Sequence, residues 1–386
     1  MKNPEALHIN SYFLTNKIHH NFYLTIKRYR NDKFLIPVYS HFKKGPIQNI
    51  EIDYIYNSID KHIFFSKVIK VLFLLYKKKM FTGYDYIHAH TLMSDGIPAF
   101  FLSYINKKPY VVTVRNADVN HFIKRSRFFK SIAGKILGNA RIVFFVSPSY
   151  KRLVEDMFPL LDKSKHLLLP NGIDDYWLNN LKKAESSNYS FSKVNILFVG
   201  KIIRLKNLNL LLDFIGRYDD RCYNLNIVGE NVLGYDFESL NKSLRNDNSV
   251  NYLGEVTDKA ELMHIYRQND VFVLLSSPET FGVVYIEALS QGLPIIYSKG
   301  QGVDGYFEDG IVGASCGLSV AELKSKIDYI ISNYNVISAN TTGAVKDFTW
   351  EYLAKKYIEN VNRSLIGGKS VVPESSNNNH MKVLET

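Results

Sequence analysis

The amino-acid sequence predicts an α/β fold made of two doubly wound domains, each with a parallel sheet covered by helices. Two series of alternating strand-like and helix-like segments follow one another along the chain. A turn-rich stretch at residues 170–174 and a polar stretch at residues 182–193 separate the two series. A chain of 386 residues is long enough to bury two cores, so we expect two domains.

The first series supplies the sheet of the N-terminal domain. Helical spacing of apolar residues appears at residues 97–105 and 128–137, between short apolar runs. Ligands of such sheets bind at the carboxyl ends of the strands, so the polar residues that follow the strands are candidates for a site. The predicted strands cover residues 7–12, 34–37, 86–89, 110–114 and 142–147.

The second series supplies the sheet of the C-terminal domain. Its predicted helices cover residues 207–218 and 260–267, and another opens near Val283. The alternation again favours a parallel sheet. The predicted strands cover residues 195–199, 225–228, 250–252, 271–275 and 293–297.

The domain limits follow from the turn-rich and polar stretches. We place the N-terminal domain at residues 1–178 and the C-terminal domain at residues 179–346. A last helix at residues 347–366 carries apolar residues at helical spacing. The polar tail at residues 367–386 is predicted to be disordered.

Composition narrows the class of protein and its compartment. Two cysteines, Cys222 and Cys316, cannot build a disulfide framework, which fits a reducing compartment. The most apolar run, residues 68–76, is interrupted by Lys70 and is too short to span a bilayer. The first residues do not read as a signal peptide. We therefore expect a cytoplasmic protein.

The positive charge lies in the first half of the chain. Residues 1–180 hold 27 Lys and Arg against 13 Asp and Glu, whereas the remainder holds 21 against 24. An anionic partner is therefore expected for the first half, and nucleic acid, an anionic membrane and a phosphorylated acceptor are all candidates. The sequence contains no recognisable nucleic-acid recognition module, so we expect no nucleic acid.

The most informative stretch runs from residue 274 to residue 294. Glu279 lies in a predicted loop and Glu287 on the following helix, with seven residues between them. The backbone N–H groups of Phe281, Gly282 and Val283 stand at the helix start, where unpaired donors and the helix dipole bind anions. Carboxylates accept hydrogen bonds from sugar hydroxyls. The pattern indicates a nucleotide-sugar, although both acids can also be read as solvated residues at a helix start.

A second block carries cations after the strand at residues 195–199. Gly200 ends the strand, and Lys201, Arg204 and Lys206 follow within six residues. Transfer from a nucleotide-sugar leaves negative charge on the departing diphosphate, which a metal ion or fixed cations must neutralise. The sequence contains no Asp-x-Asp pattern. We therefore expect no metal and assign the neutralisation to the cations.

Both blocks resemble motifs of the family 4 retaining glycosyltransferases. Glu279-Thr-Phe-Gly-Val-Val-Tyr-Ile-Glu287 resembles the E-x7-E signature of that family. Gly200 to Asn207 resembles its Gly-Arg-x4-Lys-Gly element, with Lys206 at the Lys position, Lys201 at the Arg position and Asn207 at the final Gly. A lysine cannot provide the bidentate contact of an arginine, and Arg204 is a possible substitute.

The resemblance covers residues 7–365 and is densest at residues 195–310. It implies the GT-B fold, with two facing Rossmann-like domains and a C-terminal helix that crosses back to the first domain. It also implies that Glu279 contacts the donor sugar, that Glu287 contacts the ribose, and that Lys201 and Lys206 grip the diphosphate. Glu279, Lys201 and Lys206 are therefore the expected catalytic residues, and the reaction is expected to retain the anomeric configuration.

Further matches extend the predicted donor site and leave the acceptor side open. Gly229 follows a strand where the family places a glycine beneath the nucleotide, and the segment that ends at Val256 matches the region bordering the base. A loop at residues 302–305 resembles the Gly-Gly loop of the family, or is only a turn. Arg115 stands where many members carry a His, and a guanidinium cannot act as a general base. The candidates on the acceptor side are His90, Arg115, Asn116 and Asp118.

Two segments combine basic and aromatic residues, which suits a membrane surface. They lie at residues 67–79 and 121–130. Ordinary helices with a solvated face are the alternative. A protein located at the inner face of the plasma membrane could reach a lipid-linked acceptor there.

The expected activity is transfer of a hexose or N-acetylhexosamine from a UDP-sugar or GDP-sugar to an acceptor hydroxyl. The acceptor is expected to be a saccharide, which is lipid-linked in bacterial surface-polysaccharide synthesis. The alternatives are a nucleotide-sugar epimerase or hydrolase of the same fold, and a non-catalytic protein that binds a sugar nucleotide or a polyanion.

Overall fold

The protein is described by a computed structural model, which covers residues 3–14, 17–42, 50–61, 63–182, 191–244 and 247–366. The described residues form two compact units. The first contains Met1–Phe145, Leu153–Leu169 and Ala354–Thr386, and the second contains Val146–Arg152 and Pro170–Leu353. The predicted disordered tail and most of the polar stretch at residues 182–193 lie outside the described residues.

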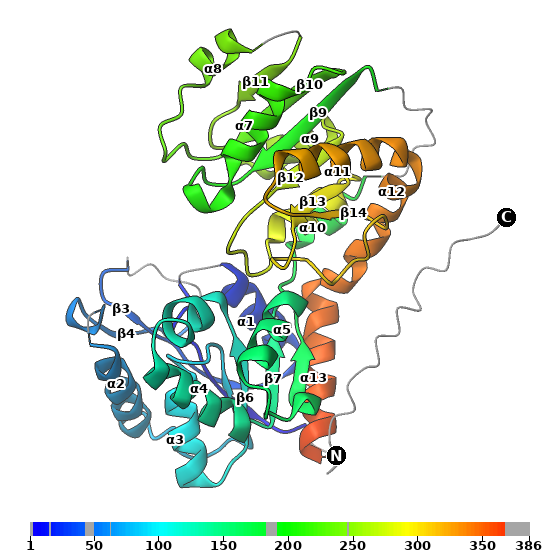
Figure 1. Cartoon of the computed structure of the whole chain (residues 1–386). Coiled ribbons are helices and arrows are strands. Elements are labelled where there is room, and N and C mark those ends of the chain that lie inside the picture. The colour runs from blue at the N-terminus through cyan, green and yellow to red at the C-terminus, as the bar shows by residue number, and fades with distance from the viewer. Residues whose placement is uncertain are drawn as a thin grey trace, which may run out of the picture. The chain divides into compact units, whose positions relative to one another are not determined.

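The first unit is built on a six-stranded parallel sheet in the order β2-β1-β5-β6-β7-β8. Figure 1 labels β6 and β7 of this sheet. Strands β1, β5, β6 and β7 are buried along their whole length, as expected for a parallel sheet covered on both faces. Strands β3 and β4 form a separate, two-stranded parallel sheet. The strands are β1 (Ala6–Ile9), β2 (Lys33–Leu35), β3 (Pro37–Tyr39), β4 (Asp53–Tyr56), β5 (Tyr86–Ala89), β6 (Tyr110–Val114), β7 (Ile142–Phe145) and β8 (His166–Leu168).

The helices of the first half alternate with these strands. Their buried positions recur at helical spacing, for example Val68, Val71 and Leu75 on α2. A short π-helix, Asp118–Ile123, precedes α4. The helices are α1 (Lys17–Tyr29), α2 (Phe64–Lys77), α3 (Gly96–Asn106), α4 (Arg127–Asn139) and α5 (Pro148–Met157).

The second unit repeats the architecture with the strand order β11-β10-β9-β12-β13-β14, again all parallel. Its strands are β9 (Lys193–Val199), β10 (Cys222–Val228), β11 (Ser249–Tyr252), β12 (Val271–Leu274), β13 (Ile295–Ser298) and β14 (Gly313–Cys316). Its helices are α6 (Asp175–Asn179), α7 (Leu208–Arg217), α8 (Phe237–Ser243), α9 (Lys259–Arg267), α10 (Val283–Ser290), α11 (Val320–Ser332) and α12 (Tyr334–Thr341).

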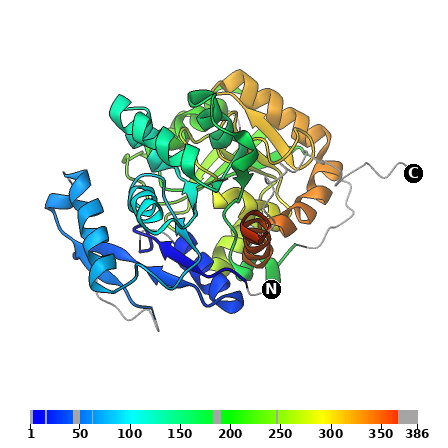
Figure 2. The same ribbon diagram turned by 90° about the horizontal axis from the view of Figure 1, so that it is seen from below.

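The last helix, α13 (Trp350–Ile366), begins in the second unit and continues in the first. At its start, the Trp350 ring packs against Gly172, where a Cβ atom would lie 2.6 Å from the indole. Further along, the Tyr357 hydroxyl lies 3.0 Å from the Tyr86 hydroxyl in the first unit. Figure 2 shows this helix end-on. The expected α/β fold with two parallel-sheet domains and a returning C-terminal helix is therefore confirmed.

None of the helices in the described part of the chain combines the length and the apolar composition that a bilayer span needs.

Candidate donor site and the family of the chain

The second sheet has a topological switch point between β9 and β12. Strand β9 lies between β10 and β12, so the chain leaves β9 toward one side of the sheet and later returns on the other. The loops after β9 and β12 therefore emerge side by side at the carboxyl edge, which is where open α/β sheets bind their ligands. These two loops carry the two blocks that the sequence singled out.

The two blocks meet through an ion pair between Lys206 and Glu279. The Lys206 Nζ lies 2.8 Å from Glu279 Oε2, with 23% and 15% of the two side chains exposed. Two hydrogen bonds hold the loops together beside it. The Ser277 N–H donates to the Leu205 carbonyl at 2.8 Å, and the Asn207 side-chain amide donates to the Leu275 carbonyl at 2.6 Å. A cation and a carboxylate thus share one accessible point at the switch.

Asn207 explains how this sequence departs from the glycine of the family motif. Its backbone is left-handed, with φ 49° and ψ 38°. Asparagine tolerates this conformation better than other residues with a side chain. Its amide also makes the bond to Leu275, which a glycine could not make.

The backbone of Glu279 is held by the loop that follows β13. Its N–H donates to Gln301 Oε1 at 2.9 Å, and its carbonyl accepts from the Gly302 N–H at 2.9 Å. Its own Oε1 accepts from the Thr280 N–H at 3.1 Å. Sequence reasoning missed Gln301. The signal for it was its place directly before the predicted loop at residues 302–305.

Helix α10 starts at Val283, as the sequence predicted, and Gly282 is its N-cap. The φ of Gly282 is 76°, and a Cβ atom there would lie 2.4 Å from the Tyr285 ring, so only glycine fits. The side chain of Phe281 is buried and packs edge-on against Tyr306. Phe281 and Val283 flank Gly282 at the helix start, and the Phe281 ring belongs to the core. A role of their backbone N–H groups in binding an anion stays a prediction.

Glu287 lies in the middle of α10 and is half-buried. Burial raises the pKa of its carboxyl to about 7, partly offset by the Tyr266 hydroxyl, 3.5 Å from Oε2, and by Lys259. Lys259 itself pairs with Asp174 at 2.6 Å. The carboxyl is therefore partly protonated near neutral pH and can both donate and accept hydrogen bonds.

The remaining predicted donor residues lie in the segments that follow β9, β10 and β11. Lys201 Nζ lies 2.6 Å from Glu230 Oε2, and both side chains are about half exposed. A Cβ atom on Gly229 would lie 2.1 Å from the Gly200 carbonyl oxygen, so glycine is required where the two strand ends approach each other. Arg204 is exposed and forms no ion pair with any described residue, and Val256 packs half-buried on the core.

The predicted acceptor residues follow β5 and β6 in the first unit. Both oxygens of Asp118 accept backbone hydrogen bonds, from the N–H groups of Leu92, Met93 and Arg115 at 3.0, 2.9 and 2.8 Å. Burial raises its pKa to about 6. The Asp118 carboxyl therefore joins the loop after β5 to the loop after β6. Its role in binding hydroxyls stays a prediction.

Arg115 and Asn116 begin the loop after β6. Arg115 is half-buried, and burial lowers the pKa of its guanidinium to about 10. Its Nε lies 3.5 Å from the His90 carbonyl oxygen. The Asn116 side chain accepts a hydrogen bond from Asn120 one turn later. The roles of both residues toward an acceptor remain predictions.

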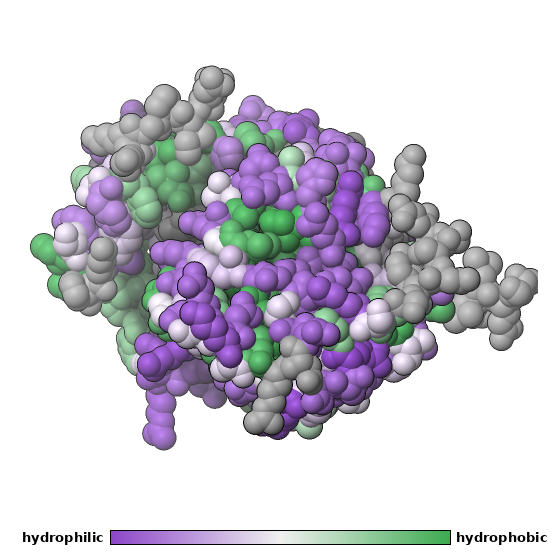
Figure 3. Space-filling view, turned by 90° about the horizontal axis from the view of Figure 1, so that it is seen from above, coloured by the Kyte–Doolittle hydropathy of each residue, from purple (hydrophilic) through white to green (hydrophobic). Residues whose placement is uncertain are grey.

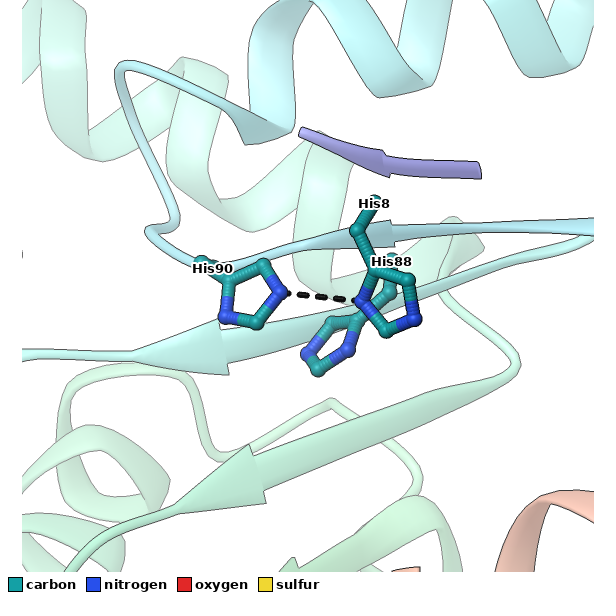
Figure 4. Close-up of side chains that lie close together, drawn as sticks. All are labelled: His8, His88 and His90. Atoms are coloured by element: carbon teal, nitrogen blue, oxygen red, sulfur yellow. Dashed lines mark hydrogen bonds between the residues drawn. The ribbon is translucent and has the colours of Figure 1, made fainter. Parts of the chain in front are cut away.

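His90 belongs to a buried histidine cluster with His8 of β1 and His88 of β5 (Figure 4). His8 Nδ1 lies 3.0 Å from His90 Nε2, and His88 Nε2 lies 3.0 Å from the Thr113 hydroxyl. Burial lowers the pKa of all three rings.

Among the described residues, these rings are the one group of metal-ligating side chains that lie within 4.8 Å of one another. The His88 and His90 rings, however, stack at 4.1 Å with planes 24° apart. Stacked imidazoles point their lone pairs past each other rather than at one ion. The geometry thus favours neutral, hydrogen-bonded rings.

Comparisons with known proteins agree with this geometry. Residues 182–343 match the family model described as glycosyl transferases group 1, and residues 38–176 match the one described as glycosyltransferase family 4. An uncharacterised 41.2 kDa protein of the Klebsiella pneumoniae cps region is 27% identical over 64% of this chain and 69% of its own. The alpha-monoglucosyldiacylglycerol synthase of Acholeplasma laidlawii is 25% identical over 70% of this chain and 73% of its own.

The fold matches solved structures over nearly the whole chain. The crystal structure of Anabaena HepE in complex with UDP superposes with a TM-score of 0.69, at 18% identity, over 93% of this chain and 99% of HepE. The two family models match one after the other along the chain, as the two parallel sheets do. This match agrees with the motifs that lie at the switch point. The chain belongs to the family 4 glycosyltransferases and has their GT-B fold.

Proposed function

We propose that the protein transfers a hexose or N-acetylhexosamine from a UDP-sugar or GDP-sugar to the hydroxyl of a saccharide acceptor, with retention of configuration. The observation that carries this proposal is the Lys206–Glu279 pair at the switch point of the second sheet. The complex of HepE with UDP-glucose supports a nucleotide-sugar donor. Retention comes from the family resemblance.

The residues of the second unit would act on the charge that develops during transfer. Lys206 and Lys201, with the backbone N–H groups of Gly282 and Val283, would stabilise the leaving diphosphate, because fixed positive groups act most strongly where negative charge appears. Glu279 would position the sugar and stabilise positive charge at its anomeric carbon. Glu287 would hold the ribose hydroxyls. The proposal needs no bound metal ion.

The acceptor side is proposed for the first unit. His90, Arg115, Asn116 and Asp118 follow neighbouring strands there, and Arg115 carries the charge that a phosphorylated acceptor needs. The name of the Acholeplasma relative indicates a glycolipid product, which supports a lipid-linked acceptor for this chain. Surface-polysaccharide synthesis is the setting that the family resemblance suggests.

A lipid-linked acceptor requires the protein at a membrane surface, and we propose the inner face of the plasma membrane. Helix α2 exposes Ile69, Phe73 and Tyr76, which are 66%, 64% and 72% exposed. Apolar side chains on an exposed helix face bury themselves at a lipid interface. Figure 3 shows that green, hydrophobic residues gather at places on the surface, including toward the left of the view.

A donor screen tests the activity. Purified protein is incubated with UDP- and GDP-sugars, with and without saccharide acceptors, and the released nucleoside diphosphate is measured. Release that depends on an acceptor supports a transferase. Release without an acceptor would instead indicate a hydrolase, and tight donor binding without any release would indicate a non-catalytic protein.

A further inference from the structure

A cavity lined by cations lies between the π-helix and the start of α4 in the first unit. Its volume is about 250 Å³. The side chains of Lys124, Arg125, Arg127 and Lys130 line it, together with the apolar Ile123 and Met157. A phosphate group with part of a headgroup fits in this volume. None of the residues proposed for donor or acceptor binding lines the cavity.

The four cations have no acidic partner among the residues that the structure describes. None of them forms an ion pair with a described carboxylate, and all four residues are exposed. Lys130 instead places its ammonium 5.6 Å from the centre of the Phe158 ring. Four like charges around one cavity repel one another, so a bound anion lowers the free energy of the site. Two of them are arginines, which bind phosphate oxygens in bidentate fashion.

An apolar surface adjoins the cations. Phe128 and Phe129 of α4 pack against Phe65 of α2, with ring centres 6.1 and 6.3 Å apart. Phe65 and Phe128 are nonetheless 40% and 59% exposed. The exposed apolar side chains continue from Phe65 along one face of α2 at spacings of four, four and three residues, to Ile69, Phe73 and Tyr76.

The combination identifies the kind of partner. A soluble anion would need the cations alone, whereas exposed phenylalanines beside them gain free energy only in an apolar environment. Charge and apolar surface together are the two signals that stable binding to an anionic membrane requires. Other exposed apolar side chains of the chain, such as Val336 on α12, lie on elements outside this surface.

We infer that the cavity binds the phosphate of an anionic phospholipid headgroup, while Phe65, Phe128 and the exposed face of α2 enter the lipid. This inference deepens the proposed function, because it rests on an acceptor that is reached at a membrane. It names the site that holds the first unit on the membrane and the chemistry of the lipid that the site selects.

Vesicle binding tests the inference with the full chain. The partition of the wild type onto vesicles of phosphatidylglycerol in phosphatidylcholine is compared with that of the variant Lys124→Gln/Arg125→Gln/Arg127→Gln. Its matched control is Arg217→Gln/Lys242→Gln/Lys346→Gln, which removes three exposed charges from the second unit. We expect the cavity variant to bind roughly a hundredfold more weakly and the control to bind like the wild type.

A second pair of variants tests the apolar part. Phe128→Ser should weaken binding to the same vesicles several-fold, whereas Val336→Ser should not. Equal binding by the cavity variant and its control would overturn the inference. Saturable binding of inorganic phosphate that depends on the three cations, without any loss of vesicle binding in the cavity variant, would also overturn it and would indicate a site for a soluble phosphate.

The outcome is independent of the chemistry in the second unit. Transfer to a water-soluble acceptor should proceed at the wild-type rate in the cavity variant. A protein that binds vesicles through the cations but turns over no nucleotide-sugar would refute the proposed function and leave the lipid site standing.

Discussion

The ammonium of Lys206 and the carboxylate of Glu279 lie 2.8 Å apart, although 72 residues separate them in the chain. They meet because β9 and β12 are neighbours at the switch point of the second sheet. In the proposed function, Lys206 neutralises the departing phosphate and Glu279 stabilises the sugar. Because the two side chains form an ion pair, each also fixes the position of the other.

We expect Lys206→Ala and Glu279→Gln each to lower kcat by roughly a hundredfold to a thousandfold. The double variant should lose less than the sum of the two in free energy, because the residues act together. Steady-state kinetics measure this effect, with the exposed Lys242→Ala as the control. Near-normal turnover by Glu279→Gln would refute the role of Glu279.

Gln301 should act as a positioning residue, because its side chain accepts the backbone N–H of Glu279. Gln301→Ala removes one hydrogen bond of about 1 kcal/mol and should lower kcat about fivefold, with little change in the donor KM. The exposed Gln268→Ala, at the residue that caps the C-terminus of α9, is the matched control. A change in KM alone would argue against positioning of Glu279.

Donor binding should depend on pH through Glu287, whose pKa is raised to about 7. The ionised carboxylate accepts hydrogen bonds from ribose hydroxyls more strongly than the neutral acid does. The donor KM should therefore rise as the pH falls from 8 to 6, and Glu287→Gln should remove this dependence. A KM profile that is the same in the wild type and in Glu287→Gln would contradict the assignment.

The buried histidine cluster should make the fold sensitive to acid. Burial lowers the pKa of His8, His88 and His90 in the folded state, so below pH 6.5 the unfolded chain binds more protons than the folded one. The contribution of the three rings to the free energy of unfolding is present above that pH. It is lost as the pH falls, by up to about 1.4 kcal/mol per pH unit for each ring.

Two buried carboxyls act in the opposite direction and must be separated from the histidines. Burial raises the pKa of Asp95 to about 7 and that of Asp118 to about 6, so their contribution is lost as the pH rises. NMR titration of the histidine rings separates the two effects. Because burial lowers their pKa, the three buried rings should titrate below the ordinary pKa of histidine. Titration of His88 and His90 near pH 6.5 would refute the predicted contribution of the histidine cluster to acid sensitivity.

The strands and helices that the sequence predicted share a continuous apolar run or a clear helical spacing. Strands such as β5 and β6 occur where the sequence placed them. Strands β4, β8 and β14 were not predicted. They are short, and β14 consists of Gly-Ala-Ser-Cys, so its identity as a strand comes from pairing with β13 rather than from its own residues.

The sequence by itself determined the two-sheet fold, the family, and the residue types that meet at the donor site, because short-range patterns and motif spacing carry that information. Only the tertiary structure decided the partners of these residues. It assigned Gln301 to Glu279, gave the oxygens of Asp118 to three backbone amides, and buried His90 beside His8. The physical reason is that burial and hydrogen-bond partners arise when distant loops come together at strand ends, and no local pattern records that encounter.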